Sequence, residues 1–229
     1  MFDYPELVRQ AKADGMAQVG FSHLEGLLPP SLAHLPYGIT LVFALSSQIV
    51  APVADGPTYP YFQHYRTANA FLDSWALRAA ARLELAGYRA LPVAASQSIP
   101  PREAYRGLFP HKTAAVAAGL GWIGKSALLV TPKWGPRVRL ATVLTDCPLP
   151  VEERPAYPGC GECTVCRDAC PAGAITGRKA GPGRKREDFY SPELCSKHMK
   201  TYQHIGRGAV CGICMARCPV GMEAKSALL

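Results

Sequence analysis

The hydrophobic and polar positions of the chain change their period several times before residue 90. Residues 1–15 carry charged side chains between spaced apolar ones, which predicts an amphipathic helix. Residues 37–46 are almost continuously apolar and predict a buried strand. Residues 62–87 predict a long helix that ends at Gly87. We expect the apolar face of this helix to contain Phe71, Trp75, Leu77, Leu83 and Leu85.

The same mixture of elements continues as far as residue 145. Residues 88–94 predict a strand, and the alanine-rich residues 111–118 predict a helix. Residues 126–131 and 138–145 predict two strands on either side of a turn rich in proline and glycine. Helices and strands in this order predict an α+β, or mixed α/β, fold.

A change of composition follows at residues 148–158, where four prolines and three charged residues replace the apolar periodicity. The cysteine-rich part of the chain begins just after this segment. We therefore expect two domains, an α/β domain over residues 1–150 and a small ferredoxin-like domain over residues 151–229.

The overall composition argues against disorder and against membrane insertion. The chain has 229 residues, of which 48% are hydrophobic, and this is enough for a full core. Residues 1–15 lack the apolar centre of a signal peptide. Residues 39–53, the most apolar segment, are interrupted by polar residues and are too short to cross a bilayer. We expect a soluble, cytoplasmic protein with no membrane partner.

The nine cysteines are crowded toward the end of the sequence. None precedes Cys147, and eight fall between Cys160 and Cys218. In a reducing compartment this crowding indicates metal ligands and not disulfides. Cys147 is left over, and we expect it to be a small, partly buried apolar residue without a redox role.

The spacing of these eight cysteines indicates two [4Fe-4S] clusters. The first four and the proline after them form C-x₂-C-x₂-C-x₃-C-P, in which three thiolates bind one cube and the fourth binds the other. A shorter copy follows, with an upstream cysteine in place of the missing one. One predicted ligand set is Cys160, Cys163, Cys166 and Cys218. The other predicted set is Cys195, Cys211, Cys214 and Cys170. Structural zinc also uses four thiolates, but typically as two separated pairs, so we favour clusters.

The formal net charge of +8 suggests a nucleic-acid partner at first sight. Each cluster with its four thiolates adds about −2, so two clusters lower the net charge to about +4. The clearest basic run lies in residues 178–186, among glycines and a proline, and is expected to form a loop. It is either a solvated connection, which we favour, or a contact for RNA or an acidic partner.

A glycine-rich segment over residues 119–126 matches both G-x₄-G-K-S and G-x-G-x-x-G. Both phosphate-binding motifs require a strand before the loop and a helix after it. Here a helix is expected before the loop and a strand after it, so nucleotide hydrolysis is not favoured. Such a loop does suit close approach to a large flat cofactor. The candidate cofactor-binding residues are Gly119, Gly121, Trp122, Gly124 and Lys125.

These motifs together resemble the epoxyqueuosine reductase family of cobalamin-dependent iron-sulfur enzymes. The resemblance includes His111-Lys112, the run Ala-Gly-Leu-Gly-Trp-Ile-Gly-Lys that ends at Lys125, residues 128–132, residues 138–146 and both cluster motifs. It implies a nitroreductase-like, corrinoid-binding first domain, a plan that reductive dehalogenases share. It also implies that the clusters pass electrons to cobalamin, and that the protein acts in queuosine biosynthesis.

The resemblance also implies a proton donor about a dozen residues before the Ala-Gly-Leu-Gly motif, where the family has an aspartate. This chain has Tyr105 there, with Glu103 nearby, and both are candidate catalytic residues. The chain stops 11 residues after Cys218, where full-length tRNA-modifying relatives continue into a helical-repeat domain. We therefore expect a small-molecule or modified-nucleoside substrate ahead of tRNA.

Three functions remain open at this stage. The first is a corrinoid-dependent reductase that receives electrons from a donor such as ferredoxin or flavodoxin. The second is a non-catalytic electron carrier, or a reductive activator of another protein's corrinoid. The third, a nucleotide-driven reductase, would require specific nucleotide binding. Retention of cobalamin by the purified protein separates the first from the second.

Overall fold

The computed structural model describes residues 2–101, 105–153, 155–181, 183–208 and 210–222. Its α-helices are α1 (Tyr4–Ala13), α2 (Ser47–Val50), α3 (Tyr59–Leu85), α4 (His111–Ala117), α5 (Val165–Asp168), α6 (Pro192–Met199) and α7 (Ile213–Ala216). Its strands are β1 (Gln18–His23), β2 (Tyr37–Ala44), β3 (Ala90–Val93), β4 (Trp122–Ile123), β5 (Leu129–Val130) and β6 (Val138–Thr145). Its 3₁₀ turns are η1 (Pro30–Leu32), η2 (Ala51–Ala54), η4 (Arg186–Asp188) and η5 (Lys200–Tyr202). This mixture confirms the expected α+β class.

The chain forms two compact units, and each contains segments that are distant in sequence. The first unit contains Met1–Ala44, Thr67–Leu120 and Arg139–Ala156. The second unit contains Leu45–Arg66, Gly121–Val138 and Tyr157–Leu229. The cysteine-rich segment therefore packs with two segments that precede it by tens of residues.

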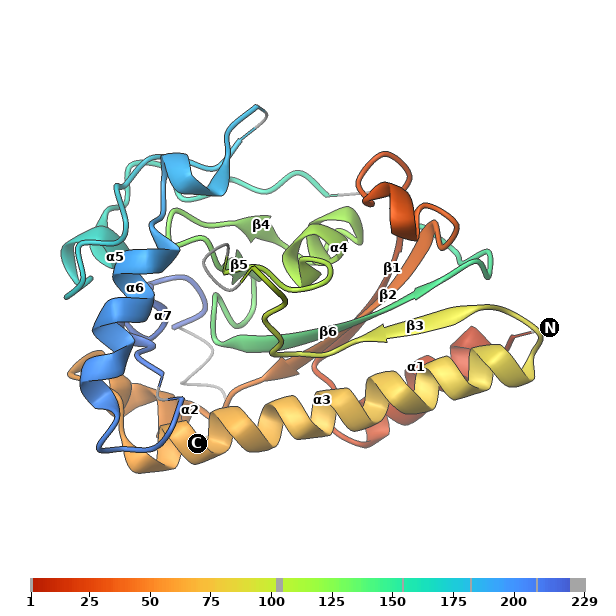
Figure 1. Ribbon diagram of the computed structural model, residues 1–229, viewed down its shortest axis with the longest axis horizontal. Coiled ribbons are helices and arrows are strands. Elements are labelled where there is room, and N and C mark those ends of the chain that lie inside the picture. Colours follow the sequence, from red (N-terminus) through yellow and green to blue (C-terminus); the bar gives the residue numbers. More distant parts are fainter. Residues whose placement is uncertain (1, 102–104, 154, 182, 209, 223–229) are drawn as a thin grey trace. The chain divides into compact units, whose positions relative to one another are not determined.

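The first unit is built on a four-stranded sheet with the order β1-β2-β6-β3 (Figure 1). β1 pairs antiparallel with β2, so that Gly20 lies opposite Thr40. β3 pairs antiparallel with β6, so that Val93 lies opposite Thr142. The sequence analysis predicted three of these strands, and β6 has the expected bounds. It missed β1, in which apolar Val19 and Phe21 alternate with small or polar residues.

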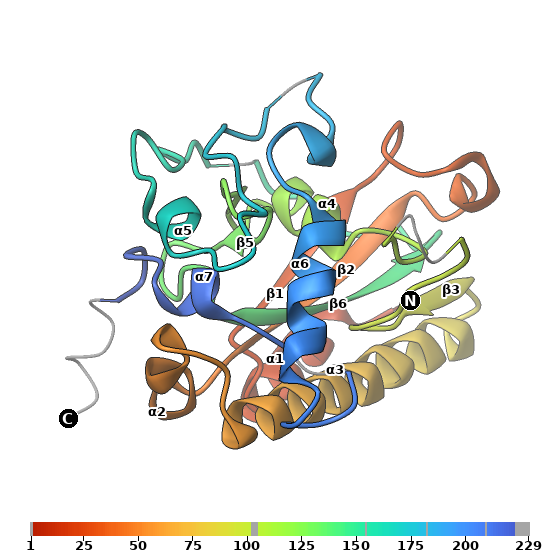
Figure 2. The same cartoon turned by 60° about the vertical axis from the view of Figure 1, so that its left-hand side comes forward.

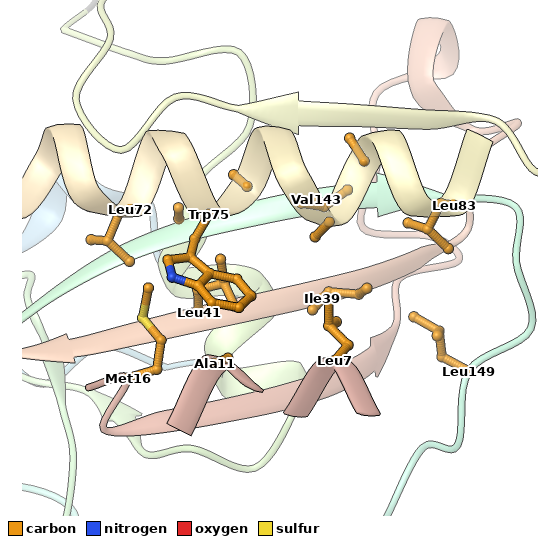
Figure 3. Packing of buried hydrophobic residues seen from close by; sticks show 14 of the residues in the cluster. Leu7, Ala11, Met16, Ile39, Leu41, Leu72, Trp75, Leu83, Val143 and Leu149 are labelled. Carbon is orange, nitrogen blue, oxygen red and sulfur yellow. The ribbon is translucent and has the colours of Figure 1, made fainter. Parts of the chain in front are cut away.

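Helices cover both faces of this sheet, with α1 and α3 on one face and α4 on the other (Figure 1). The core between the sheet and the α1–α3 layer contains Leu7, Ile39, Trp75 and Val143 (Figure 3). The neighbouring residue Leu144 belongs instead to a second core with residues of α4. Successive side chains of a strand point to opposite faces, so β6 supplies both cores and is buried on both sides.

The apolar face predicted for the long helix was partly wrong. Trp75 and Leu83 are buried, but Leu77 is 62% exposed and Leu85 is 89% exposed. The helix turns about 100° per residue, so Leu77 lies about 200° around the helix from Trp75. The buried stripe continues instead through alanines such as Ala79, whose small side chains let the helix approach the sheet.

The strand predicted over residues 126–131 is shorter than expected. Only β5 is extended, and it pairs with β4 in a two-stranded hairpin of the second unit. The Gly124 amide donates to the Leu128 carbonyl at 2.8 Å, and the Ala127 amide donates to the Gly124 carbonyl at 2.9 Å. These bonds close a turn over residues 125–128, which breaks the predicted strand.

The rest of the second unit consists of short helices, 3₁₀ turns and loops (Figure 2). Its tightest packing involves glycines. A Cβ on Gly212 would lie 2.8 Å from the Tyr61 hydroxyl, and a Cβ on Gly206 would lie 2.3 Å from the Phe62 ring. In the part of the chain that the structure describes, no helix is long and apolar enough to cross a membrane.

Candidate metal centre

The eight motif cysteines lie on short helices and the loops beside them, all within the second unit. Cys166 is on α5, Cys195 on α6 and Cys214 on α7. The remaining five lie in the loops next to these helices: Cys160, Cys163, Cys170, Cys211 and Cys218. All nine cysteines of the chain are free thiols. The absence of disulfides leaves these thiols available as ligands.

Three other thiols lie close to Cys166. Burial raises the pKa of Cys166 to about 11, and the neighbouring thiolates of Cys160, Cys218 and Cys163 contribute to the same increase. Like charges raise a thiol pKa only when they are close, so these four sulfur atoms share one site. We call them thiol group A. The grouping brings Cys218 to the first cysteine loop, as the crossed ligand assignment expects.

Cys214 and the three remaining thiols form thiol group B. The Cys214 pKa is raised first by burial and then by the thiolates of Cys211, Cys195 and Cys170, with the smallest contribution from Cys166 of group A. Cys170 belongs to the first motif in sequence but to the second group in space. The structure therefore assembles the two sets that the spacing predicts, while the role of each thiol as a ligand stays a prediction.

The number of thiols in each group fits a cluster, because one [4Fe-4S] cube takes four cysteine ligands. In the described ranges, no three His, Cys, Asp or Glu side chains are arranged to hold a single metal ion. Four thiolates on zinc would each lie about 2.3 Å from the metal and therefore close to one another. A cube of iron and sulfide between the thiolates keeps them farther apart. Because burial raises the pKa of Cys166 and of Cys214, an electropositive centre is needed to hold these two thiols deprotonated.

Group B has a further polar neighbour that the sequence analysis missed. The Tyr190 hydroxyl donates a hydrogen bond to the Cys195 thiolate and opposes the increase in the Cys195 pKa that burial causes. Burial also raises the pKa of Tyr190 itself, so its hydroxyl stays neutral. Tyr190 is held by a β-bridge to Ile175. No sequence motif marks this tyrosine.

Group A has two cationic neighbours, of which the sequence analysis named one. The Lys125 ammonium donates to the Cys163 carbonyl at 2.9 Å. The Arg137 guanidinium donates to the Val220 carbonyl at 2.7 Å, and also to the carbonyl of Cys218. Arg137 follows the proline-glycine turn between β5 and β6, and its sequence position alone gives no sign of this role.

The glycine-rich segment has the context that argues against a phosphate-binding loop, because α4 precedes it and β5 follows it. Two of its glycines allow the strands of the β4–β5 hairpin to pack closely. A Cβ on Gly121 would lie 2.1 Å from the Val130 carbonyl oxygen. A Cβ on Gly124 would lie 2.7 Å from the Val130 side chain and 3.6 Å from the Cys160 sulfur. Gly119 has a φ of +68°, which allows the chain to leave α4.

Trp122 completes this segment. Its ring lies 5.5 Å from the Tyr157 ring, centroid to centroid. Its indole N–H is buried and has no hydrogen-bond partner among the described residues. A buried donor without an acceptor is costly. The indole N–H of Trp75 in the first unit is unpaired in the same way.

The candidate proton donors are only partly described. Tyr105 is half-buried and has a φ of +47°. This left-handed conformation costs a non-glycine residue about 1–2 kcal/mol. Strained residues of this kind are common at functional sites. Glu103 lies outside the described residues.

Two other sequence predictions have clear outcomes. Cys147 is 3% exposed and belongs to the core of the first unit, and burial raises its pKa. The expected apolar role is confirmed. Around the basic run, Lys179 pairs with Glu162 at 3.1 Å and Arg186 pairs with Glu187 at 2.7 Å, so part of its charge is neutralised locally.

Residues 159–221 match a 4Fe-4S double cluster binding domain. This segment contains all eight cysteines of groups A and B. The match agrees with two [4Fe-4S] clusters in the second unit, as the spacing and the grouping of the thiols indicate.

Similar proteins support the resemblance drawn from the motifs. An epoxyqueuosine reductase of Gloeobacter violaceus is 36% identical over 121 residues, which cover 50% of this chain and 37% of that protein. One from Escherichia coli is 46% identical over 80 residues, which cover 35% of this chain and 21% of that protein. The matching part of the chain thus covers 37% of the length of the first relative and 21% of the length of the second.

Solved structures extend the similarity to the fold. A catabolic reductive dehalogenase aligns with a TM-score of 0.72 at 19% identity, over 94% of this chain and 32% of that one. The epoxyqueuosine reductase of Streptococcus thermophilus aligns with a TM-score of 0.62 at 18% identity, over 96% of this chain and 66% of that one. The chain is therefore similar in sequence to epoxyqueuosine reductases over up to half of its length, and similar in fold to epoxyqueuosine reductases and a reductive dehalogenase over nearly all of it.

Proposed function

We propose that this chain is an iron-sulfur reductase in which two [4Fe-4S] clusters pass electrons to cobalamin and then to a substrate. The observation that carries the proposal is the sorting of eight thiols into groups A and B, because two sets of four free thiols match the ligand demand of two cubes. The names of the similar reductases support the reaction class.

Cobalamin enters the proposal through the similar proteins. One solved relative is described as a reductive dehalogenase whose structure suggests a mechanism for B12-dependent dehalogenation. In this chain, Gly121 and Gly124 are fully engaged by the hairpin, so their small size does not by itself indicate a corrin site. The unpartnered Trp122 indole N–H fits better, since it would donate to an amide carbonyl of a corrinoid.

The residues have distinct proposed roles. Gly119, Gly121, Trp122, Gly124 and Lys125 form the segment on the cofactor side. Tyr105 and Glu103 are the candidate proton donors, and the strained backbone of Tyr105 supports its candidacy. A bound corrinoid would supply a low-potential cobalt centre for the reduction, while the protein orients it and provides the proton.

The partners follow from this chemistry. The clusters need a low-potential electron donor, such as ferredoxin or flavodoxin, and a reducing compartment such as the cytoplasm. The substrate is a small molecule or a modified nucleoside. One similar epoxyqueuosine reductase was solved with an epoxyqueuosine-modified tRNA stem loop, so tRNA is included among the candidates to be tested.

The test is anaerobic purification followed by iron, sulfide and cobalamin analysis. We expect about eight irons and eight sulfides per chain, and binding of added cobalamin at micromolar concentration. Tyr105→Phe should leave cobalamin binding intact and slow substrate reduction. Four irons, or stoichiometric zinc, would contradict the cluster assignment.

The same experiment separates the alternative function. Eight irons without cobalamin binding would support a non-catalytic electron carrier, or a reductive activator of another protein's corrinoid. Tight Mg-ATP binding that Lys125→Ala abolishes would instead support a nucleotide-driven enzyme, which the hairpin context argues against.

A further inference from the structure

Two buried cations contact the cysteine loops of group A, and both come from the segment Gly121–Val138 of the same unit. Lys125 is 4% exposed and Arg137 is 5% exposed. A buried lysine or arginine is rare, because removing its charge from water is costly unless an opposite charge compensates. The positions of these two side chains therefore require an explanation.

Both side chains hold backbone carbonyls of the ligand loops. Lys125 donates to the Cys163 carbonyl at 2.9 Å. Arg137 donates to the carbonyls of Ala216, at 3.2 Å, and of Cys218, and to the Val220 carbonyl at 2.7 Å. Together they hold the first cysteine loop and the Cys218-Pro219 turn, which are distant in sequence but supply the same thiol group.

Carbonyl oxygens satisfy the N–H donors but do not neutralise the charges. Among the described residues, neither cation forms an ion pair with a carboxylate. Exposed Glu162 is near enough for Lys125 to contribute to its lowered pKa, although Lys179 is the larger cause. Burial lowers the pKa of Arg137, and the Cys218 thiolate opposes that shift. Both cations hold the carbonyls of group A cysteines, so the thiolates of these loops supply counter-charge.

Group B has a different environment. Its contact from Tyr190 is a neutral hydroxyl that donates to the Cys195 thiolate. The cation near Tyr190 is Arg186, which is paired with Glu187 at 2.7 Å. Among the described residues, the buried charged side chains are Lys125 and Arg137, and both contact the loops of group A. Reduction potentials of clusters depend on net charge and on hydrogen bonds around the sulfur ligands.

We infer that Lys125 and Arg137 are positioning residues that raise the reduction potential of the group A cluster above that of the group B cluster. One-electron reduction changes a [4Fe-4S] cluster with four thiolates from about −2 to about −3, with the electron taken from a low-potential donor. Nearby buried cations stabilise the added negative charge, because a low dielectric strengthens the attraction. The inference rests on the cluster ligands of the proposed function and is independent of cobalamin.

The test is a mediated redox titration of anaerobic holo-protein, with dithionite as reductant and the cluster signals followed by electron paramagnetic resonance. Arg137→Gln and Lys125→Met remove a charge at each position, and Arg137→Lys keeps it. Lys179→Gln removes an exposed cation beside Glu162, near the same loop, as the matched control. Iron and sulfide content is measured for every variant.

We expect Arg137→Gln and Lys125→Met to lower the potential of one cluster and to leave the other unchanged. Arg137→Lys should retain most of the wild-type potential, and Lys179→Gln should shift it least because water screens that charge. If Arg137→Gln loses iron, the Lys125→Met titration tests the inference in its place. Unchanged potentials in Lys125→Met, or equal shifts in both clusters, would overturn the inference. Fewer than eight irons in the wild type would instead contradict the cluster assignment.

Discussion

Each of the two units of this chain is stabilised by different interactions. Both buried hydrophobic clusters lie in the first unit, where helices cover the two faces of a regular sheet. The second unit has short elements, tight glycine contacts and two cations bound to loop carbonyls. The first unit is stabilised mainly by hydrophobic burial, whereas the second requires clusters bound to its cysteine ligands.

Removal of iron should have the largest effect on stability, and this effect should differ between the two units. A chelator is expected to abolish amide protection in the second unit, because structural metal binding contributes on the order of 10 kcal/mol in small domains. Segments Leu45–Arg66 and Gly121–Val138 should lose protection together with the cysteine loops. Hydrogen exchange followed by mass spectrometry measures this. Equal loss of protection in the sheet would show that the units do not differ in this way.

Trp75→Ala should act on the first unit instead. Trp75 is 2% exposed and lies between α3 and the sheet (Figure 3). Its truncation leaves a cavity that costs about 3–5 kcal/mol. Leu77→Ala on the same helix is the matched control, and we expect a change within about 0.5 kcal/mol because Leu77 is exposed. Urea unfolding followed by circular dichroism compares the two variants.

Two glycines of the second unit, Gly212 and Gly208, have the same left-handed backbone but different surroundings. Gly212 has a φ of +82° and no room for a Cβ beside Tyr61, whereas Gly208 has a φ of +77° and nothing within 4 Å. Gly208→Ala should cost about 1–2 kcal/mol from the left-handed conformation. Gly212→Ala should cost about 2–4 kcal/mol, because steric overlap is added. The rate of iron loss during thermal unfolding is the measurement, and equal rates for both variants would remove the steric argument.

Acid should weaken the first unit through His111. Its Nε2 donates to the Ala94 carbonyl, and its Nδ1 forms a hydrogen bond with the Thr142 hydroxyl, both at 2.9 Å. Burial lowers the His111 pKa to about 4. Well above pH 6.5 the ring is neutral in both the folded and unfolded states. As pH falls toward 4, only the unfolded state gains the proton, and stability decreases.

The loss between pH 6.5 and pH 5 should be about 1.6 kcal/mol. Urea titrations at several pH values measure it. His111→Gln should flatten this dependence and leave the iron content at pH 7 unchanged. A profile as steep as that of the wild type would assign the acid effect to other groups.

The sequence predicts the two units unequally, and the reason is physical. Strand β6 follows from its nearly continuous apolar run, because it is buried on both faces of the sheet. Helix α3 follows from its length and its end at Gly87, but its buried face includes alanines that the prediction did not name. The cysteine spacing predicts groups A and B because a cube fixes the reach of its ligand loop. Arg137 and Tyr190 could not be found in this way. Each acts through a contact between segments that are distant in sequence, and neither belongs to a local motif.

The continuous helix α3 has a consequence for how the protein is made. Its first turns belong to the second unit, and its remainder, from Thr67, belongs to the first. On the ribosome, the first unit has all of its segments once residue 156 has emerged, whereas the second must wait for Cys218. Chains are synthesised from the N-terminus, and units fold as their segments become available. Cluster insertion is therefore a late step, and it reaches a chain whose sheet has already formed.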